Sequence, residues 1–444
     1  PAEAIQLMDK YPESPDFLFQ MLLSSIDINL ETGLEISKRM NDTSILSPIH
    51  HAGIAKIAES TGLLEDAREA ITRALNVWND EPRWHALAAK LNEKLNDIQK
   101  ARSHWQAAVD LEPNNSDYLL MLATSHMNVG DLDKAVSVLE DASQLNRNQV
   151  EIWMMLATIH MNLGKYEEAL EYAEFAGTAD SNSSRSLELA GQISLKMGRL
   201  DLAIQYAQRA WDRSPLDPGA ILLLSQVFEA AGRTQDALKV IEKIDDIVAI
   251  SPELGIQQAK LIRKVRGSKG ALPIMQELAQ KYPDHAEVLN TMAEIQAECG
   301  TLLDAVRSAT ASLRLKPEQP ALHLLLGRIH RGTGQLDQAV HHFGEAIRQS
   351  PANIDAYIEL GKTYQDQRQH LQAVRVYEEA INIAPNDHRP YYHAAITLRE
   401  AKDYRGAESL LRRAVQLSPD DLSIRRQLAA IVALNMVYNS QEMH

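Results

Sequence analysis

The residues that could carry catalytic or metal chemistry are few and poorly placed for it. The chain of 444 residues has one cysteine, Cys299, and two adjacent histidine pairs, His50-His51 and His341-His342. Neighbours on a helix point about 100° apart, so each pair makes a poor chelate. The sequence contains no phosphate-binding glycine loop, no HExxH motif and no paired cysteines. We therefore expect no catalytic residue, no cofactor and no metal site in this region.

A second group of candidates is rich in methionine and histidine. It lies in two nearly duplicated segments, LLMLATSHMNVG and IWMMLATIHMNLG, which contain Met127, Met154, Met161, His126 and His160. Thioether and imidazole groups could bind copper(I). Methionines could instead form an adaptable apolar groove for a partner helix or strand, or simply pack in a core. The sequence leaves these interpretations open.

Basic residues recur farther along the chain. Residues 301–444 hold 17 Lys and Arg against 16 Asp and Glu, whereas the first 300 hold 28 against 44, so the formal charge of −15 comes from the first two-thirds. The recurring basic residues are Lys260, Arg263, Arg328, Arg331, Lys362 and Arg399. One hypothesis is a positively lined trough for an acidic protein segment. The alternative is an ordinary solvated helix face.

Composition excludes several classes of protein. The apolar share of 45% with 24% charged residues is typical of a globular chain. A single cysteine excludes a disulfide scaffold, and no apolar run is long enough to span a membrane. The acidic total and the scarcity of aromatic residues among the basic ones argue against a nucleic-acid partner.

The elements that position these residues follow a strict 34-residue period. From Ala321 to Pro351 the sequence gives two apolar-periodic segments separated by Gly334, and steps of 34 recover the pattern along the chain. We divide residues 14–421 into twelve units and number positions 1–34 within each. The units start at residues 14, 48, 82, 116, 150, 184, 218, 252, 286, 320, 354 and 388.

Each unit predicts a hairpin of two helices, A and B. Helix A carries apolar residues at positions 4, 7, 8 and 11, and helix B carries small or apolar residues at 20, 24 and 27, so each set shares one helical face. Small residues such as Gly361, Ala373 and Ala380 allow the two backbones to approach closely. Glycine at position 15 predicts the left-handed turn between the helices, and proline at position 32 ends helix B.

This pattern resembles the tetratricopeptide repeat family. The matching positions are Trp or Leu at 4, Leu at 7, Gly or Ala at 8, Tyr or His at 11, Ala at 20, Phe or Tyr at 24, Ala at 27 and Pro at 32. The resemblance implies an all-α, right-handed superhelical solenoid of about twelve repeats. It also implies that helix-A positions 2, 5, 9, 12 and 13 line a concave groove that binds partner proteins. The methionines and the basic residues above occupy such positions.

The ends of the chain extend the same pattern. Residues 1–13 are consistent with helix B of an earlier, partial repeat, and residues 422–444 with a capping helix and a tail. Because the sequence begins inside a repeat without a methionine, we expect a fragment of a longer protein. A cytoplasmic location is expected, with an upstream signal peptide left open. Within the array, Gly255, Gln258 and Pro273 occupy packing positions, which predicts a flexure over residues 245–273.

These observations favour a non-catalytic scaffold that binds a protein or peptide in its groove. Two other hypotheses stay open, because repeat arrays host many functions. The chain could be the recognition arm of a larger enzyme, such as a sulfotransferase or a glycosyltransferase, or an envelope-assembly protein. The identity of the partner and the oligomeric state do not follow from the sequence.

Overall fold

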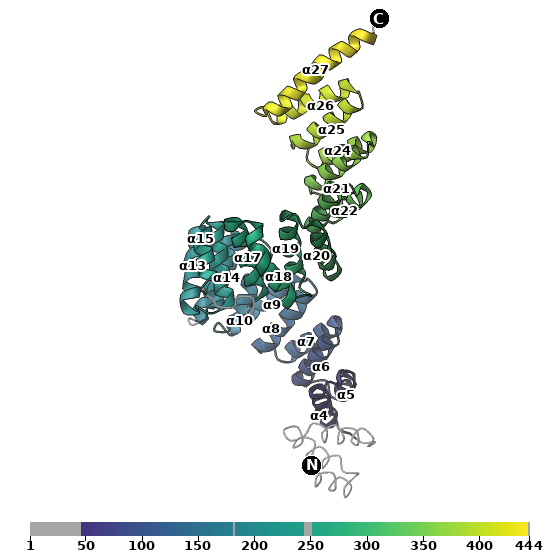
Figure 1. Cartoon of the computed structure of the whole chain (residues 1–444). Helices are drawn as coiled ribbons and strands as arrows, with labels where there is room; N and C mark the ends of the chain where they lie inside the picture. Colours follow the sequence, from purple (N-terminus) through teal and green to yellow (C-terminus); the bar gives the residue numbers. More distant parts are fainter. Residues whose placement is uncertain (1–45, 181–182, 244–250, 443–444) are drawn as a thin grey trace. The chain divides into compact units, whose positions relative to one another are not determined.

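The backbone is a succession of helices joined by short turns (Figure 1). The computed structural model describes residues 46–180, 183–243 and 251–442, and within these it has 23 helices and no strand. The predicted partial repeat of residues 1–13 and the unit starting at residue 14 lie outside the described residues. The chain divides into two compact units, residues 1–227 and 228–444, with the boundary inside one helix, α14.

In the first unit, helices A and B alternate. The helices A are α4 (Pro48–Ser60), α6 (Pro82–Lys94), α8 (Ser116–Asn128), α10 (Val150–Asn162), α12 (Arg185–Lys196) and α14 (Pro218–Ala230). The helices B are α5 (Leu64–Val77), α7 (Ile98–Leu111), α9 (Leu132–Leu145), α11 (Tyr166–Ala179) and α13 (Leu200–Arg213).

The second unit repeats the alternation. Its helices A are α17 (Pro252–Arg266), α19 (Ala286–Glu298), α21 (Pro320–Gly332), α23 (Ile354–Asp366), α25 (His388–Glu400) and α27 (Leu422–Glu442). Its helices B are α15 (Thr234–Ile241), α18 (Ser268–Lys281), α20 (Leu302–Leu315), α22 (Leu336–Gln349), α24 (His370–Ile383) and α26 (Tyr404–Leu417). The fold is thus an all-α solenoid of helix hairpins, as the period predicts.

The turn between helices A and B depends on one left-handed residue. Gly130 has φ 79°, and after it the amide of Asp131 donates to the carbonyl of His126 over 3.0 Å, which is the bond that closes a Schellman motif. Where glycine is missing, Asn96, Arg368 and Lys402 take the same position with φ of 61°, 58° and 66°. The turn geometry is therefore imposed by the packing of the hairpin even where the local sequence disfavours it.

Fully buried small residues let the two helices of each hairpin approach. Alanine occupies position 20 in every described hairpin, and each of these side chains is 0% exposed. These residues are Ala67, Ala101, Ala135, Ala169, Ala203, Ala237, Ala271, Ala305, Ala339, Ala373 and Ala407. A larger residue at this position would force the backbones apart, because protein interiors are close-packed.

Two glycines on helix A accept an aromatic ring from helix B at contact distance. A Cβ added at Gly327 would lie 2.5 Å from the ring of Phe343, and one added at Gly361 would lie 2.4 Å from the ring of Tyr377. Both rings are 0% exposed, so they have no room to move aside.

Gly255 makes a similar close approach, contrary to the weak packing that the sequence predicts for it. It is buried in α17, and an added Cβ would meet Leu278 of α18 at 2.7 Å. Gly255 is therefore a tight contact and not a packing defect. Pro273 lies inside α18, and residues 244–250, which form part of the predicted flexure, lie outside the described residues.

The contacts of each helix are confined to near neighbours in sequence. In the described parts of each unit, the extensive helix–helix contacts join a helix to the next one along the chain or to the next but one. Each unit is therefore held together by local interactions, as expected for a repeat protein.

One carboxylate in the first unit destabilises the folded state when it is ionised. Glu188 of α12 lies against Asp217 at the start of α14, and its Oε1 atom is buried without a hydrogen-bond partner. Burial and the neighbouring Asp217 raise the pKa of the Glu188 carboxyl. A raised pKa in the folded state means that the ionised form opposes folding, and that this penalty disappears as the pH falls below that pKa.

Replacement of Glu188 by glutamine is expected to stabilise the first unit at neutral pH, because it removes a buried charge beside Asp217. Chemical denaturation across a pH series should show the largest gain near neutrality and a shrinking gain toward the acid range. The exposed Glu171→Gln substitution on α11 is the control and should change stability little. An equal effect of both substitutions would contradict the assignment.

Gly327→Ala is expected to destabilise the second unit by about 1–3 kcal/mol, because the added methyl group overlaps the Phe343 ring. Gly344→Ala is the matched control in α22, since a Cβ there meets nothing within 4 Å. That control should stabilise the helix by about 0.5–1 kcal/mol. Denaturant unfolding of the two variants measures both values, and a destabilisation common to both would refute the packing argument.

Candidate functional site

The surface made by helix-A positions 2, 5, 9, 12 and 13, which we call the helix-A face, carries a ladder of ion pairs. Position 12 of one helix A pairs with position 13 of the next, 35 residues later. The pairs are Glu59–Lys94 at 2.7 Å, Glu229–Lys264 at 2.5 Å, Arg263–Glu298 at 2.6 Å and Arg331–Asp366 at 2.6 Å. The ladder joins neighbouring hairpins on this face.

A second set of links joins position 12 of one helix A to position 6 of the next. Gln257 donates to Glu229 over 2.6 Å, Arg331 donates to Glu359 over 3.0 Å, and Arg399 donates to Gln427 over 2.8 Å. Polar groups on this face are thus mostly satisfied within the chain.

The predicted basic residues are largely neutralised by this arrangement. Lys260 pairs with Glu287 at 3.5 Å, and Lys362 pairs with Glu359 at the same distance. Arg263 lies 3.2 Å from Glu294 in addition to its contact with Glu298, and Arg331 is shared between Glu359 and Asp366. These guanidinium and ammonium groups are therefore paired with carboxylates of the same chain.

Arg328 is different. Its side chain is exposed on α21, and within the described part of the chain its guanidinium makes no ion pair or hydrogen bond. Arg328 is the one member of the predicted basic set that makes neither an ion pair nor a hydrogen bond among the described residues. An external hydrogen-bond acceptor could therefore bind to its guanidinium.

Arg328 borders a pocket of about 570 Å³ on the helix-A face of the second unit. Ala297 of α19 and Leu324, Leu325 and Ile329 of α21 supply apolar walls. The pocket coincides with a gap in the ladder, because positions 12 and 13 here are Ala297 and Gly332. With no ion pair across them, α19 and α21 leave a hollow with apolar walls, which the ion-paired Arg263, Glu294 and Glu298 also line, beside the unpaired Arg328.

The helix-A face of the first unit has its own pocket, of about 550 Å³. It lies along α4 and α6, and Arg83, Trp84, Leu87 and Lys90 are among its walls. It too combines apolar and cationic groups.

The three predicted methionines interrupt the ladder with apolar side chains. Met127 and Met161 occupy position 12 of α8 and α10, and Met154 occupies position 5 of α10. All three are partly buried and pack against the hydrophobic core. His126 and His160 are only 7% exposed, so the imidazoles of this segment are core residues. Among the described residues, no group of three or more His, Cys, Asp and Glu could hold a metal ion.

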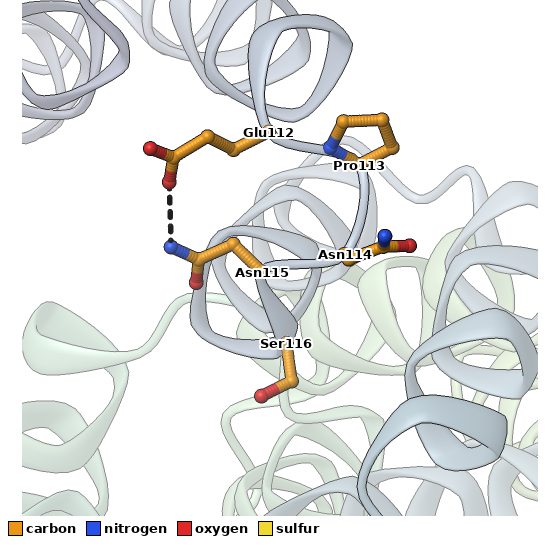
Figure 2. A pocket seen from close by; sticks show the side chains of 5 residues that line it. All are labelled: Glu112, Pro113, Asn114, Asn115 and Ser116. Carbon is orange, nitrogen blue, oxygen red and sulfur yellow. Dashed lines mark hydrogen bonds between the residues drawn. The ribbon is translucent and has the colours of Figure 1, made fainter.

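A further hollow lies at the turn between α7 and α8, and it is lined by the run from Glu112 to Ser116 (Figure 2). Asn115 donates to Glu112 over 3.0 Å, and its side-chain oxygen accepts from the amides of Asp117 and Tyr118 at the start of α8. The polar groups of this turn thus cap the helix, and the turn offers no catalytic constellation.

Sequence reasoning missed two contacts between histidines that are 19 residues apart. His85 meets His104, and His323 meets His342, in each case with Nδ1 atoms 3.1 Å apart. Sequence reasoning considered only histidines that are adjacent in the chain. Alignment of the units places both of these more distant pairs at positions 4 and 23.

No helix among the described residues is long and apolar enough to cross a membrane. Comparison with curated protein sequences finds no match.

Three family models match parts of the sequence. The model described as anaphase-promoting complex, cyclosome, subunit 3 matches residues 104–176. One tetratricopeptide repeat model matches residues 194–253 and 330–397, and another matches residues 300–354.

Solved structures with a similar course of the chain include three helical repeat proteins. The hetero-tetramer Cut9–Hcn1 of the APC/C aligns with 13% identity, a TM-score of 0.47, and coverage of 96% of this chain and 98% of that chain. Yeast Tom70 aligns with 12% identity, a TM-score of 0.43, and coverage of 88% and 96%. MamA aligns with 20% identity, a TM-score of 0.35, and coverage of 37% and 96%. The 34-residue helix hairpins and the family models show that the chain is a tetratricopeptide repeat array.

Proposed function

We propose that the chain is a non-catalytic scaffold that binds a segment of a partner protein on its helix-A face. The observation that carries this proposal is the pocket between α19 and α21, where the ion-pair ladder stops and Arg328 is unpaired. Intramolecular ion pairs occupy most of the remaining polar groups on this face of the second unit. A partner segment therefore gains the most binding free energy where the ion-pair ladder is absent.

The chemistry of the pocket specifies the kind of segment that fits it. Ala297, Leu324, Leu325 and Ile329 suit a large apolar side chain, because burying such a side chain yields about 1.5–3 kcal/mol. Arg328 suits a carboxylate one or two residues away from that side chain. One unpaired arginine implies a single specific charge contact and a weak overall dependence of binding on salt.

The methionines mark a second contact region, in the first unit. Met127, Met161 and Leu195 occupy position 12 of α8, α10 and α12, where α4, α6, α14, α17, α21 and α25 carry charged residues. Their partly buried side chains, together with that of Met154, leave an apolar stretch on the helix-A face, and flexible thioethers adapt to varied apolar partners. We propose this stretch as a site of apolar contact, without a charged anchor.

The test uses short peptides selected for binding to the whole chain from a displayed random library. Arg328→Glu is expected to weaken the selected peptides about tenfold, which corresponds to about 1.4 kcal/mol. Arg314→Glu is the matched control, because Arg314 of α20 is equally exposed and makes no ion pair among the described residues, but does not line the pocket. Fluorescence anisotropy measures both dissociation constants.

The two substitutions make the same change in net charge, so a nonspecific effect would weaken binding equally in both. Equal dissociation constants for the two variants would refute the pocket as the site. A library that yields no specific peptide at all would count against the scaffold function itself.

A further inference from the structure

Two hairpins carry the same pair of facing imidazoles. His85 of α6 faces His104 of α7, and His323 of α21 faces His342 of α22. Both pairs have Nδ1 atoms 3.1 Å apart and ring centroids 5.4 Å apart, with interplanar angles of 40° and 39°. One pair lies in each compact unit, at positions 4 and 23 of its hairpin. The geometry is therefore a repeated feature of the fold.

The proton positions in the first pair follow from a backbone carbonyl. Nε2 of His85 lies 3.0 Å from the carbonyl oxygen of Asn79, which can only accept, so Nε2 carries the proton. In the neutral ring Nδ1 is then an acceptor, and Nδ1–H of His104 donates to it. In the second pair the two Nδ1 atoms lie at the same distance, so one of the two neutral rings donates its Nδ1–H to the other.

Other hairpins make the same anchor with a side chain that does not titrate near neutrality. At position 4, the indole N–H of Trp153 donates to the carbonyl of Arg147 over 2.8 Å, and the hydroxyl of Tyr391 donates to the carbonyl of Pro385 over 3.1 Å. The two His pairs thus take the place of an indole or a phenol, and unlike those groups an imidazole can gain a proton as the pH falls.

Each pair holds a helix that lines a pocket on the helix-A face. His85 lies on α6, which supplies Arg83, Trp84 and Leu87 to the first pocket. His323 lies on α21, which supplies Leu324 and Arg328 to the second. In both cases the pair joins this helix to its helix B, so loss of the pair would release the pocket wall.

A pair can share one proton between its Nδ1 atoms but cannot hold two. If both rings are protonated, two N–H groups and two positive charges face each other across 3.1 Å at a site where both position-4 rings are under 10% exposed. Burial, with a contribution from His85, lowers the pKa of His104. Burial, with contributions from His323 and His330, lowers the pKa of His342 to about 4.

The charged groups around the second pair come from three elements. His330 of α21 stacks on His342, with centroids 5.3 Å apart. On α22, Glu345 favours protonation of both rings, whereas His341 opposes it in both and Arg348 opposes it in His323. The loop before α21 contributes the carbonyl of Pro317.

We propose that these two histidine pairs make the pockets sensitive to acid, so that a bound partner segment is released as the pH falls. A histidine whose pKa is lowered on folding contributes stability that is present above its unfolded pKa near 6.5 and is lost as the pH falls toward its folded pKa. The release step rests on the proposed function. The opening of the two hairpins does not.

Hydrogen exchange measured by mass spectrometry on the whole chain, between about pH 7.5 and pH 5, tests the opening step. Exchange in α6–α7 and α21–α22 is compared with exchange in α17–α18, which contains no histidine. A ring whose pKa falls from 6.5 to about 4 weakens the folding equilibrium of its hairpin about 30-fold at pH 5. We expect opening of α21–α22 to increase by about that factor relative to the control, and opening of α6–α7 to increase in the same direction, because the pKa of His104 is also lowered.

The variant His104→Gln combined with His342→Gln should reduce this excess, because the glutamine amide donates to the position-4 ring and gains no charge itself, whereas the position-4 ring remains. If it unfolds, His323→Trp with His342→Tyr copies the pairing of Trp153 and Tyr172 and serves instead. An equal acid response of the His-pair and control hairpins in the native chain would overturn the proposal, as would an unchanged excess in the variants.

The release step is tested with the selected peptides at the same two pH values. Weaker binding at pH 5 in the native chain, but not in the glutamine variant, supports it. Unchanged binding at pH 5, with the two hairpins shown to open, would overturn the release step alone. Failure of any peptide to bind at neutral pH would refute the proposed function and leave the exchange result to decide on the histidine pairs.

Discussion

The close approach of helix A to helix B is the constraint on which the rest of the structure depends. Position 20 must be small in every described hairpin, and helix A must offer glycine or alanine where a ring of helix B arrives, as at Gly327 beneath Phe343. Once the backbones are this close, the turn between them has to adopt a left-handed residue. The face of helix A turned away from helix B is then left to contact the next hairpin and the solvent, and this face carries the candidate site.

The sequence period predicts the hairpins well because the required residues are repeated in every unit. It predicts less about the turns, since Asn96, Arg368 and Lys402 are forced into a left-handed conformation by packing that no local pattern shows. Composition also cannot predict which of the basic side chains form ion pairs. Arg331 looks available in the sequence, but Glu359 and Asp366, contributed by the next unit, neutralise it.

The candidate site shows why residue type alone is a poor guide to a binding surface. One hypothesis placed six basic residues along a trough, and among the described residues only Arg328 of these six makes neither an ion pair nor a hydrogen bond. Its pocket lies where Ala297 and Gly332 carry no charged side chain, so that no ion pair of the ladder forms between α19 and α21. The histidine pairs escaped attention for a related reason, since their partners lie half a repeat apart and meet only when the hairpin closes.

The confinement of contacts to near neighbours has a mechanical consequence. Among the described residues, the extensive helix–helix contacts join only near neighbours in sequence, so a pulling force applied to the ends of a unit is borne by each hairpin in series. A hairpin that yields frees 34 residues of chain, which extend to roughly 110–120 Å, while its neighbours keep most of their own contacts. Each unit should therefore lengthen in steps under load, because the weakest hairpin unfolds first and the other hairpins stay folded.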